Sequence, residues 1–260
     1  MQQILDELVA RYNVPEFVDN DPVQFPRRFT DPRDIEISAF LTSIISWGRR
    51  AMILRNANRL HDLMDNEPYH FVTEGDIDSI DDSNIHRTFF GRHLRYALRG
   101  LREVYGKYGS LEAFASAIGA DKDSDPAWQI AATLNKVFDA ADKECHRPLG
   151  AEPTRCLPAD TSASALKRFN MALRWLVRND GIVDIGSWEL LKPSQLFIPL
   201  DVHSGNTSRA LGLLGRKAND RRAVEELTTA LRHFNPSDPV IYDFALFGAG
   251  EEGIAIPGAM

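Results

Sequence analysis

The segment LKRFNMALRWLVR, residues 166–178, has an apolar residue at every third or fourth position, the spacing of a helix with one buried face. The same spacing recurs along the chain, and the alternation typical of strands is scarce. Positions that follow this period include Leu5, Leu8, Val9, Leu41, Ile44, Ile45, Leu94, Leu98, Leu101, Leu166, Phe169, Leu173, Leu176, Val224, Leu227 and Leu231. The sequence therefore predicts an all-α fold with about ten helices.

Three polar residues stand where helices are expected to begin, because their side chains can accept hydrogen bonds from the first backbone N–H groups. These are Asp34, Ser110 and Asp220. Between helices, residues 76–84 and 119–126 are predicted connectors, and RPLGAEP at 147–153 is the predicted linker. GAGEEG at 248–253 has the letters of a dinucleotide-binding loop, but too few residues follow for the helix such a loop needs, so we predict a helix end there.

The composition is that of a globular protein: 260 residues, of which 43% are hydrophobic, can bury a sizeable core. No apolar run has the length of a membrane span, and the first residues lack a secretory signal pattern. We expect a cytoplasmic monomer without membrane attachment. Two cysteines, Cys145 and Cys156, are too few for a disulfide scaffold or a four-cysteine iron–sulfur cluster, and no metal or cofactor is predicted.

Charge is distributed unevenly along the chain. The net charge of −7 argues against a protein that coats nucleic acid indiscriminately. Residues 62–82 carry many acids and no Lys or Arg, whereas 87–107 is strongly basic, as are 167–178 and 209–222. Basic segments segregated from an acidic one indicate an anionic partner.

A helix predicted over residues 162–179 aligns three cations. Lys167, Arg174 and Arg178 fall within about 20° of one line at about 100° per residue. One interpretation is a solvent-exposed stripe. The other is a lysine at a substrate with arginines that reach phosphates, preceded by the turn PADTSAS at 158–164, which would offer free N–H groups and hydroxyls.

Asp201 lies in LFIPLDVHS, residues 196–204, where an apolar approach leads into the next predicted helix. An aspartate in this position is commonly a helix cap. The apolar approach also implies partial burial, and a partly buried carboxylate needs a partner or a chemical role. His203 is interpreted as a core histidine or as a contact to substrate or backbone.

Three motifs together resemble an uncharacterised bacterial family, domain of unknown function 2400: KRFNMALRWLVR at 167–178, PLDVH at 199–203 and DPVIYDFALFG at 238–248. More remotely, the layout is similar to the helix-hairpin-helix DNA glycosylases of the endonuclease III and archaeal 8-oxoguanine glycosylase type. That resemblance implies a two-lobed helical, helix-hairpin-helix DNA-glycosylase-like fold with a central cleft. One lobe would span 36–184 with the hairpin-like segment and Lys167, and the other would join 1–35 to 185–260 with Asp201.

The resemblance also assigns roles to residues. Lys167 matches the nucleophilic lysine and Asp201 the catalytic aspartate, while IISWGRR at 44–50 falls where those enzymes line the DNA cleft. The substrate-binding residues implied are Ser46, Trp47, Arg49, Arg50, Asn170, Arg174, Trp175, Arg178 and His203. The chain departs from endonuclease III in lacking the Leu-Pro-Gly-x-Gly hairpin and the cysteine cluster, and the interval from Lys167 to Asp201 is nearer the archaeal type.

The expected function is that of a DNA-repair glycosylase, with abasic-site lyase activity as a possible second step. Its partner would be double-stranded DNA with a damaged base, such as 8-oxoguanine, or an abasic site. The target nucleotide would be flipped into the protein, and the lysine would displace the base at C1′. Two alternatives stay open: a non-catalytic binder of damaged or abasic DNA, and a helical scaffold without nucleic-acid function.

Overall fold

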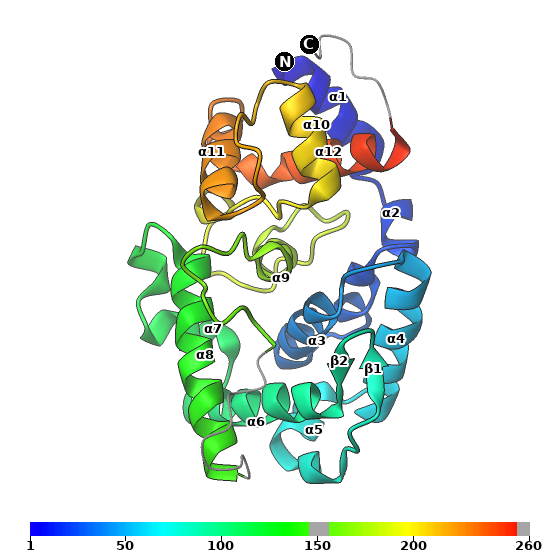
Figure 1. The fold of residues 1–260 in the computed structure, drawn as a ribbon, viewed down its shortest axis with the longest axis vertical. Coiled ribbons are helices and arrows are strands. Elements are labelled where there is room, and N and C mark those ends of the chain that lie inside the picture. The colour runs from blue at the N-terminus through cyan, green and yellow to red at the C-terminus, as the bar shows by residue number, and fades with distance from the viewer. Residues whose placement is uncertain (146–155, 254–260) are drawn as a thin grey trace. The chain divides into compact units, whose positions relative to one another are not determined.

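The computed structural model describes residues 1–145 and 156–253, which fall into two compact units (Figure 1). Unit 1 combines Met1–Asp19 with Ser162–Met260, and unit 2 is Asn20–Thr161. The boundaries thus differ from those expected at 36 and 184, and Lys167 shares a unit with Asp201. The predicted linker at 147–153 and the tail after 253 lie outside the described residues.

The all-α prediction is confirmed in both units, whose described residues form helices and one short two-stranded hairpin. The elements of unit 1 are α1 (Gln2–Tyr12), α2 (Glu16–Asp19), α9 (Lys167–Val177), η5 (Pro193–Gln195), α10 (Val202–Ala210), α11 (Arg221–Arg232), η6 (Pro239–Ile241) and α12 (Tyr242–Glu252). Among the described residues, no helix has both the length and the apolar character needed to cross a lipid bilayer.

Helix α12 packs against both α1 and α10, and its glycines explain how these helices approach so closely (Figure 1). A Cβ atom on Gly248 would lie 2.5 Å from the Tyr12 ring, and one on Gly250 would lie 2.7 Å from Thr207 Oγ1. Larger residues would therefore force the helices apart. The helix ends at Gly253, whose φ of 63° is left-handed. The glycine-rich motif is confirmed as a helix C-terminus.

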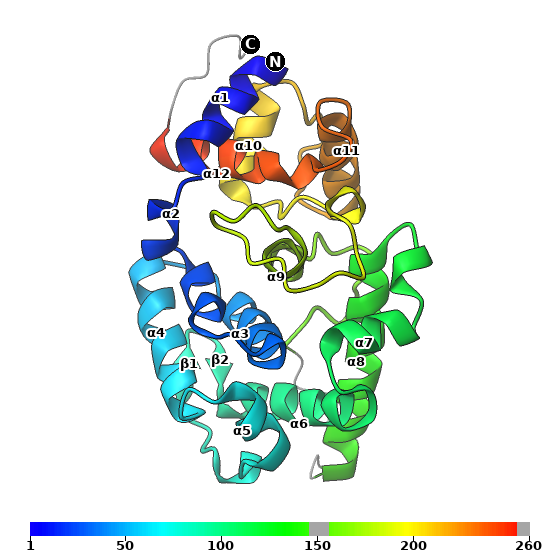
Figure 2. The ribbon, with the colours of Figure 1, turned by 180° about the vertical axis from the view of Figure 1, so that it is seen from behind.

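Unit 2 is built around helix α6, which packs on α5, α7 and α8 (Figure 2). Its elements are η1 (Pro22–Gln24), η2 (Pro26–Arg28), α3 (Pro32–Ile44), α4 (Arg50–Leu63), α5 (Pro68–Glu74), η3 (Ile77–Ser79), β1 (Asn84–His86), β2 (Phe89–Phe90), α6 (Gly91–Tyr108), α7 (Leu111–Ala117), η4 (Ala120–Lys122) and α8 (Pro126–Cys145). The antiparallel hairpin β1–β2 contacts α4 and leads directly into α6.

Two of the three predicted helix caps are confirmed. The Ser110 hydroxyl accepts from the Ala113 N–H, and the Asp220 carboxylate accepts from the Ala223 N–H. The third prediction is wrong, because α3 begins one turn earlier. Asp31 is the cap there, since Pro32 is preorganised for the first helical position, while the predicted Asp34 accepts from the Tyr69 N–H.

A buried carboxylate joins α3 to the start of α7. Glu36 is 2% exposed and accepts hydrogen bonds from the Tyr105 hydroxyl at 2.7 Å, the Leu111 N–H at 2.9 Å and the Glu112 N–H at 3.0 Å. Two of these donors belong to the first turn of α7, where backbone N–H groups have no partner within the helix. Glu36 thus satisfies them from another element.

Replacing Glu36 with Gln should destabilise the protein by about 1–3 kcal/mol, because the amide NH₂ would face one of the two backbone N–H groups and leave it without an acceptor. Chemical denaturation of the wild type and the variant measures this difference. Glu103→Gln is the control, since Glu103 is exposed on α6 and its replacement should change the free energy of unfolding by less than about 0.5 kcal/mol. Equal effects of the two substitutions would contradict the assigned role of Glu36.

Candidate functional site

The helix α9 starts later than predicted. Residues 162–166 are not helical, and Leu166 takes a left-handed conformation with φ of 46° before Lys167 opens the helix. The Ser164 hydroxyl accepts from the Leu166 N–H at 3.2 Å, and the Ala163 carbonyl accepts from the Arg221 N–H at 3.0 Å. Contacts within unit 1 therefore fix the turn that presents Lys167.

The Lys167 side chain is half-buried at the first position of α9. Its Nζ lies 3.8 Å from Met171 Sδ, one turn further along the helix. Among the described residues it forms no ion pair, which distinguishes it from the arginines of the same helix. The amine is thus held beside a thioether rather than a carboxylate.

Arg174 and Arg178 are buried, which corrects the expectation that they form a solvent-exposed stripe or reach phosphates. Their exposed fractions are 4% and 2%. Arg174 donates to Asp243 on α12 and, at 3.3 Å, to Asp184. Both guanidinium groups also lie over the Phe244 ring, at 4.3 and 5.6 Å from its centroid. The helical repeat predicted that these arginines share one side of the helix, but it could not predict the carboxylates that cover them.

Arg178 lies just beyond the last residue of α9 and binds carboxylates from two segments. It donates to Asp184, to Asp180 at 3.1 Å, and to Asp238 at 2.9 and 3.0 Å. Burial would lower the pKa of Arg178, but the facing charges of Asp184 and Asp238 outweigh it and raise the pKa. The guanidinium therefore stays charged and ties α9 to the loop before α12.

Asp201 caps helix α10, as one of the two interpretations of the sequence predicted. Its Oδ1 accepts from the Ser204 N–H at 2.9 Å and the Ser204 hydroxyl at 3.1 Å. The residue is half-buried, and its Oδ2 has no hydrogen-bond donor among the described residues. Capping thus occupies one of the two carboxylate oxygens.

Asp243, which the sequence analysis did not single out, connects these groups. It is 7% exposed, and burial raises the pKa of its carboxyl to about 6. The positive charges of Arg174 and Lys167 act to lower that pKa, and the negative charge of Asp201 acts to raise it. Lys167 and Asp201 therefore both lie close enough to influence one buried carboxyl. A lone acid inside the apolar run VIYDFALF, residues 240–247, was the available sequence signal.

Three other predicted residues of unit 1 have different surroundings. Asn170 is 1% exposed and donates to the Ala165 carbonyl at 3.1 Å, but its Oδ1 has no donor among the described residues. Trp175, an implied substrate-binding residue, is 0% exposed, because the core covers its ring and leaves it no surface for a substrate. His203 is exposed rather than a core histidine, and it binds the Gly250 carbonyl at 3.3 Å, the backbone contact that was one of its interpretations.

The remaining predicted residues lie together in unit 2, between α3 and α4. Ser46 is buried and donates to the Thr42 carbonyl at 2.8 Å, so in this structure its hydroxyl serves the end of α3 rather than a ligand. Trp47 is half-buried, with its ring edge-on to His86 at 4.7 Å. Arg49 is exposed and Arg50 half-buried at the start of α4. Trp47 and Arg49 thus lie in the loop between α3 and α4, and Arg50 opens α4.

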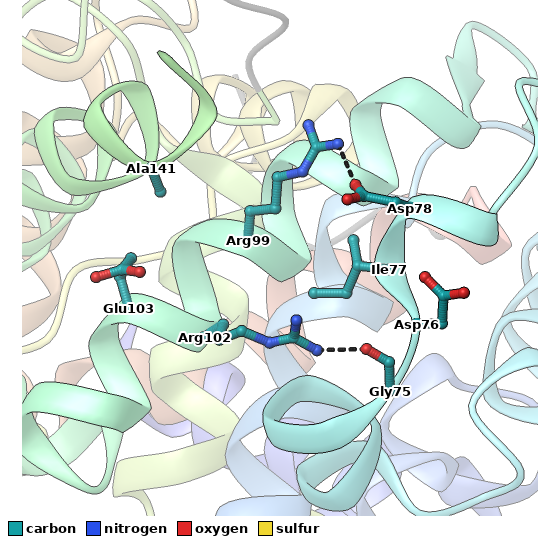
Figure 3. Close-up of a pocket in the computed structure, with 8 residues that line it drawn as sticks. All are labelled: Gly75, Asp76, Ile77, Asp78, Arg99, Arg102, Glu103 and Ala141. Carbon is teal, nitrogen blue, oxygen red and sulfur yellow. Dashed lines mark hydrogen bonds and ion pairs between the residues drawn. The ribbon is translucent and has the colours of Figure 1, made fainter. Parts of the chain in front are cut away.

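The basic segment 87–107 is largely neutralised, which corrects the inference drawn from its charge. Arg92 pairs with Asp82, and Arg99 pairs with Asp78 and Asp142. Figure 3 shows Arg99 directed at Asp78, while Arg102 donates to the Gly75 carbonyl at 2.6 Å. The acidic connector at 76–84 and the arginines of α6 are therefore partners of each other. They do not form a free basic face for an anionic ligand.

A comparison with protein families identifies the chain. A family model described as protein of unknown function (DUF2400) matches residues 21–252, which include described parts of both units. The chain belongs to this family. The DUF2400 match covers Lys167, Asp201 and Asp243, so the candidate site lies within the family region. No curated protein and no solved structure matches the chain.

The raised pKa of Asp243 predicts a specific dependence of stability on pH. Between the ordinary value of 3.8 and the folded value of about 6, the folded state holds a proton that the unfolded state has lost. The stability contributed by this carboxyl is therefore present below about pH 4 and lost as pH rises through about 6. The difference in free energy of unfolding between wild type and Asp243→Asn, from denaturation at several pH values, should fall over that range. A difference that stays constant or rises would contradict the assignment.

Proposed function

We propose that this protein is a DNA N-glycosylase that uses Lys167 as nucleophile and Asp201 as its catalytic carboxylate. The reaction type comes from the resemblance to helix-hairpin-helix glycosylases, and the assignment of that fold to the helical units is part of the same proposal. The substrate is duplex DNA with a damaged base. The imine that forms between Lys167 and the sugar gives the enzyme a route to cleave the strand at an abasic site.

The observation that carries the proposal is the position of Asp243. Its buried carboxyl responds to the charges of both Lys167 and Asp201, which come from segments separated along the chain. A buried carboxyl whose pKa is raised by burial and affected by a lysine and a second carboxylate within one unit is the kind of group found at catalytic sites.

The lack of an ion pair at Lys167 Nζ and of a donor at Asp201 Oδ2 among the described residues supports a chemical role for both groups. Lys167 has no ion pair among the described residues, and Asp201 Oδ2 has no donor there. By contrast, Arg174 on the same helix and Arg178 just beyond its end are bound to carboxylates. A structural role would be expected to pair all four charges, because unpaired charges in partly buried positions cost stability.

The chemistry follows from these positions. After losing a proton, the Lys167 amine attacks C1′ of the flipped nucleotide, the glycosidic C–N bond breaks, and its electron pair leaves with the base, which takes up a proton. The sugar ring then opens as its oxygen leaves C1′ and takes up a proton, and the nitrogen is left in an imine. Asp201 stabilises the positive charge that develops on the sugar. The buried Asp243 carboxyl is a nearby acceptor for the proton that the amine must lose.

Asn170 supplies a further argument for a ligand beside Lys167. It lies three residues further along α9, so the two side chains belong to the same face of the helix. Its buried Oδ1 has no donor among the described residues, and an unsatisfied buried acceptor costs about 1–3 kcal/mol. A donor group of the ligand would remove that cost. An oxidised purine such as 8-oxoguanine carries ring N–H and amino donors.

A non-catalytic binder of abasic DNA is the second candidate. It is favoured by the exposed position of Arg49 beside the half-buried Trp47, which would bind DNA without any lysine chemistry. The two candidates differ in whether a covalent bond forms.

Borohydride trapping tests the nucleophile. With duplexes that contain 8-oxoguanine, uracil or an abasic site, the wild type should give a covalent adduct and Lys167→Ala should give none, because the imine needs this amine. Asp201→Asn should slow base release by about a hundred-fold or more but retain trapping on DNA that is already abasic. Lys217→Ala is the matched control, since Lys217 is an exposed lysine of the same unit.

Duplex affinity measured in parallel separates the remaining outcomes. Lys167→Ala should bind abasic duplex within a few-fold of wild type. Trapping that persists in Lys167→Ala would place the nucleophile elsewhere. Salt-dependent binding with no adduct and no base release on any of the three duplexes would favour the binder.

A further inference from the structure

Helix α4, its N-cap residue and the turn of the β1–β2 hairpin carry four exposed arginines of unit 2, Arg49, Arg55, Arg59 and Arg87. None of the four forms an ion pair with any described residue. The arginines of α6 in the same unit are instead bound to carboxylates or carbonyls. In a chain with net charge −7, this is a local group of uncompensated positive charges.

The hairpin β1–β2 holds Arg87 against the loop that leads into α4. His86 is buried, accepts from Asn56 Nδ2 at 2.9 Å through Nδ1, and donates to the Trp47 carbonyl at 2.8 Å through Nε2. These two bonds pin the hairpin to α4 on one side and to the loop on the other. Arg87, the next residue, is therefore placed by a buried anchor.

The close approach of Arg87 depends on Gly48. A Cβ atom there would lie 2.6 Å from Arg87 Nη1, and Gly48 itself has a left-handed φ of 98°. Glycine alone leaves this space without strain. The Arg87 guanidinium consequently lies beside Gly48, the residue that precedes Arg49, although Arg87 is far from both in the sequence.

The other two arginines extend the charge along α4. Arg55 and Arg59 are four residues apart, so they lie on one face at about 6 Å spacing along the axis. From Arg49 to Arg59 the rise is about 15 Å, which corresponds to about four base-pair steps at about 3.4 Å per phosphate of one strand. Arginine also suits phosphate, because its planar fork can donate two hydrogen bonds.

We propose that Arg49, Arg55, Arg59 and Arg87 form a surface that binds the phosphate backbone of duplex DNA. The proposal rests on the proposed function for the choice of DNA as ligand, but the surface lies within unit 2 and needs neither Lys167 nor Asp201. A lipid surface is disfavoured because three apolar residues of α4, Ile53, Ala57 and Leu60, are buried in the unit, and only Leu63 among its large apolar side chains is exposed. An interfacial helix would instead expose its apolar face to the membrane.

Salt-dependent binding of the full chain to duplex DNA, with and without an abasic-site analogue, tests the surface. The double variant Arg55→Gln/Arg59→Gln should weaken binding about ten-fold or more at physiological salt and reduce the slope of log affinity against log salt by about two. The matched control is Arg92→Gln/Arg216→Gln, which removes the same charge from arginines already paired with Asp82 and Asp220. It should change the slope by less than about one-half.

Each outcome decides the proposal. Equal weakening by both double variants, unchanged binding in Arg55→Gln/Arg59→Gln, or no binding to any duplex would overturn it. Tight binding to phosphatidylserine vesicles that the same double variant abolishes, with unchanged binding to DNA, would assign the surface to lipid instead. Binding that follows the prediction while borohydride trapping fails would leave the surface standing without the glycosylase. A trapped adduct in the wild type, together with unchanged DNA binding in Arg55→Gln/Arg59→Gln, would support the glycosylase and overturn the surface.

Discussion

The buried ion-pair network around Arg174 and Arg178 is the constraint on which the structure of unit 1 depends. Two guanidinium groups join α9 to the loop after it, to the segment before α12 and to α12 itself. Removing one partner from a buried pair of this kind typically costs about 3–5 kcal/mol, since the other charge is left buried. The network therefore fixes the position of α9 within unit 1, and with it the position of Lys167 relative to Asp243.

The sequence predicted the elements of the fold better than their contacts. Ser110, Asp220 and Asp201 were identifiable as caps because capping depends on a few neighbouring residues. The burial of Arg174 depends on Asp243, which is remote in sequence, and no periodic pattern encodes such a pair. The same limitation applies to Arg99, whose partners Asp78 and Asp142 lie on either side of it in the chain.

The arginines of this protein therefore fall into two groups, one paired within the protein and one exposed. Arg174, Arg178 and the arginines of α6 are bound to the protein's own carboxylates or carbonyls, whereas Arg49, Arg55, Arg59 and Arg87 stay exposed. Lys167 stands apart from both groups, because it is half-buried and has no ion pair among the described residues. The distribution of charge along the sequence does not separate these groups, since they differ in which side chains contact them in the fold.

The central claim is that Lys167 and Asp201 act at one place in unit 1, next to Asp243. NMR titration of isotope-labelled aspartate carboxyls in wild type, Lys167→Ala and Asp201→Asn tests it most directly, without any substrate. Removing the positive charge of Lys167 should raise the pKa of Asp243 above its value of about 6, and removing the negative charge of Asp201 should lower it. If both variants leave the pKa of Asp243 unchanged, the two residues do not share a site.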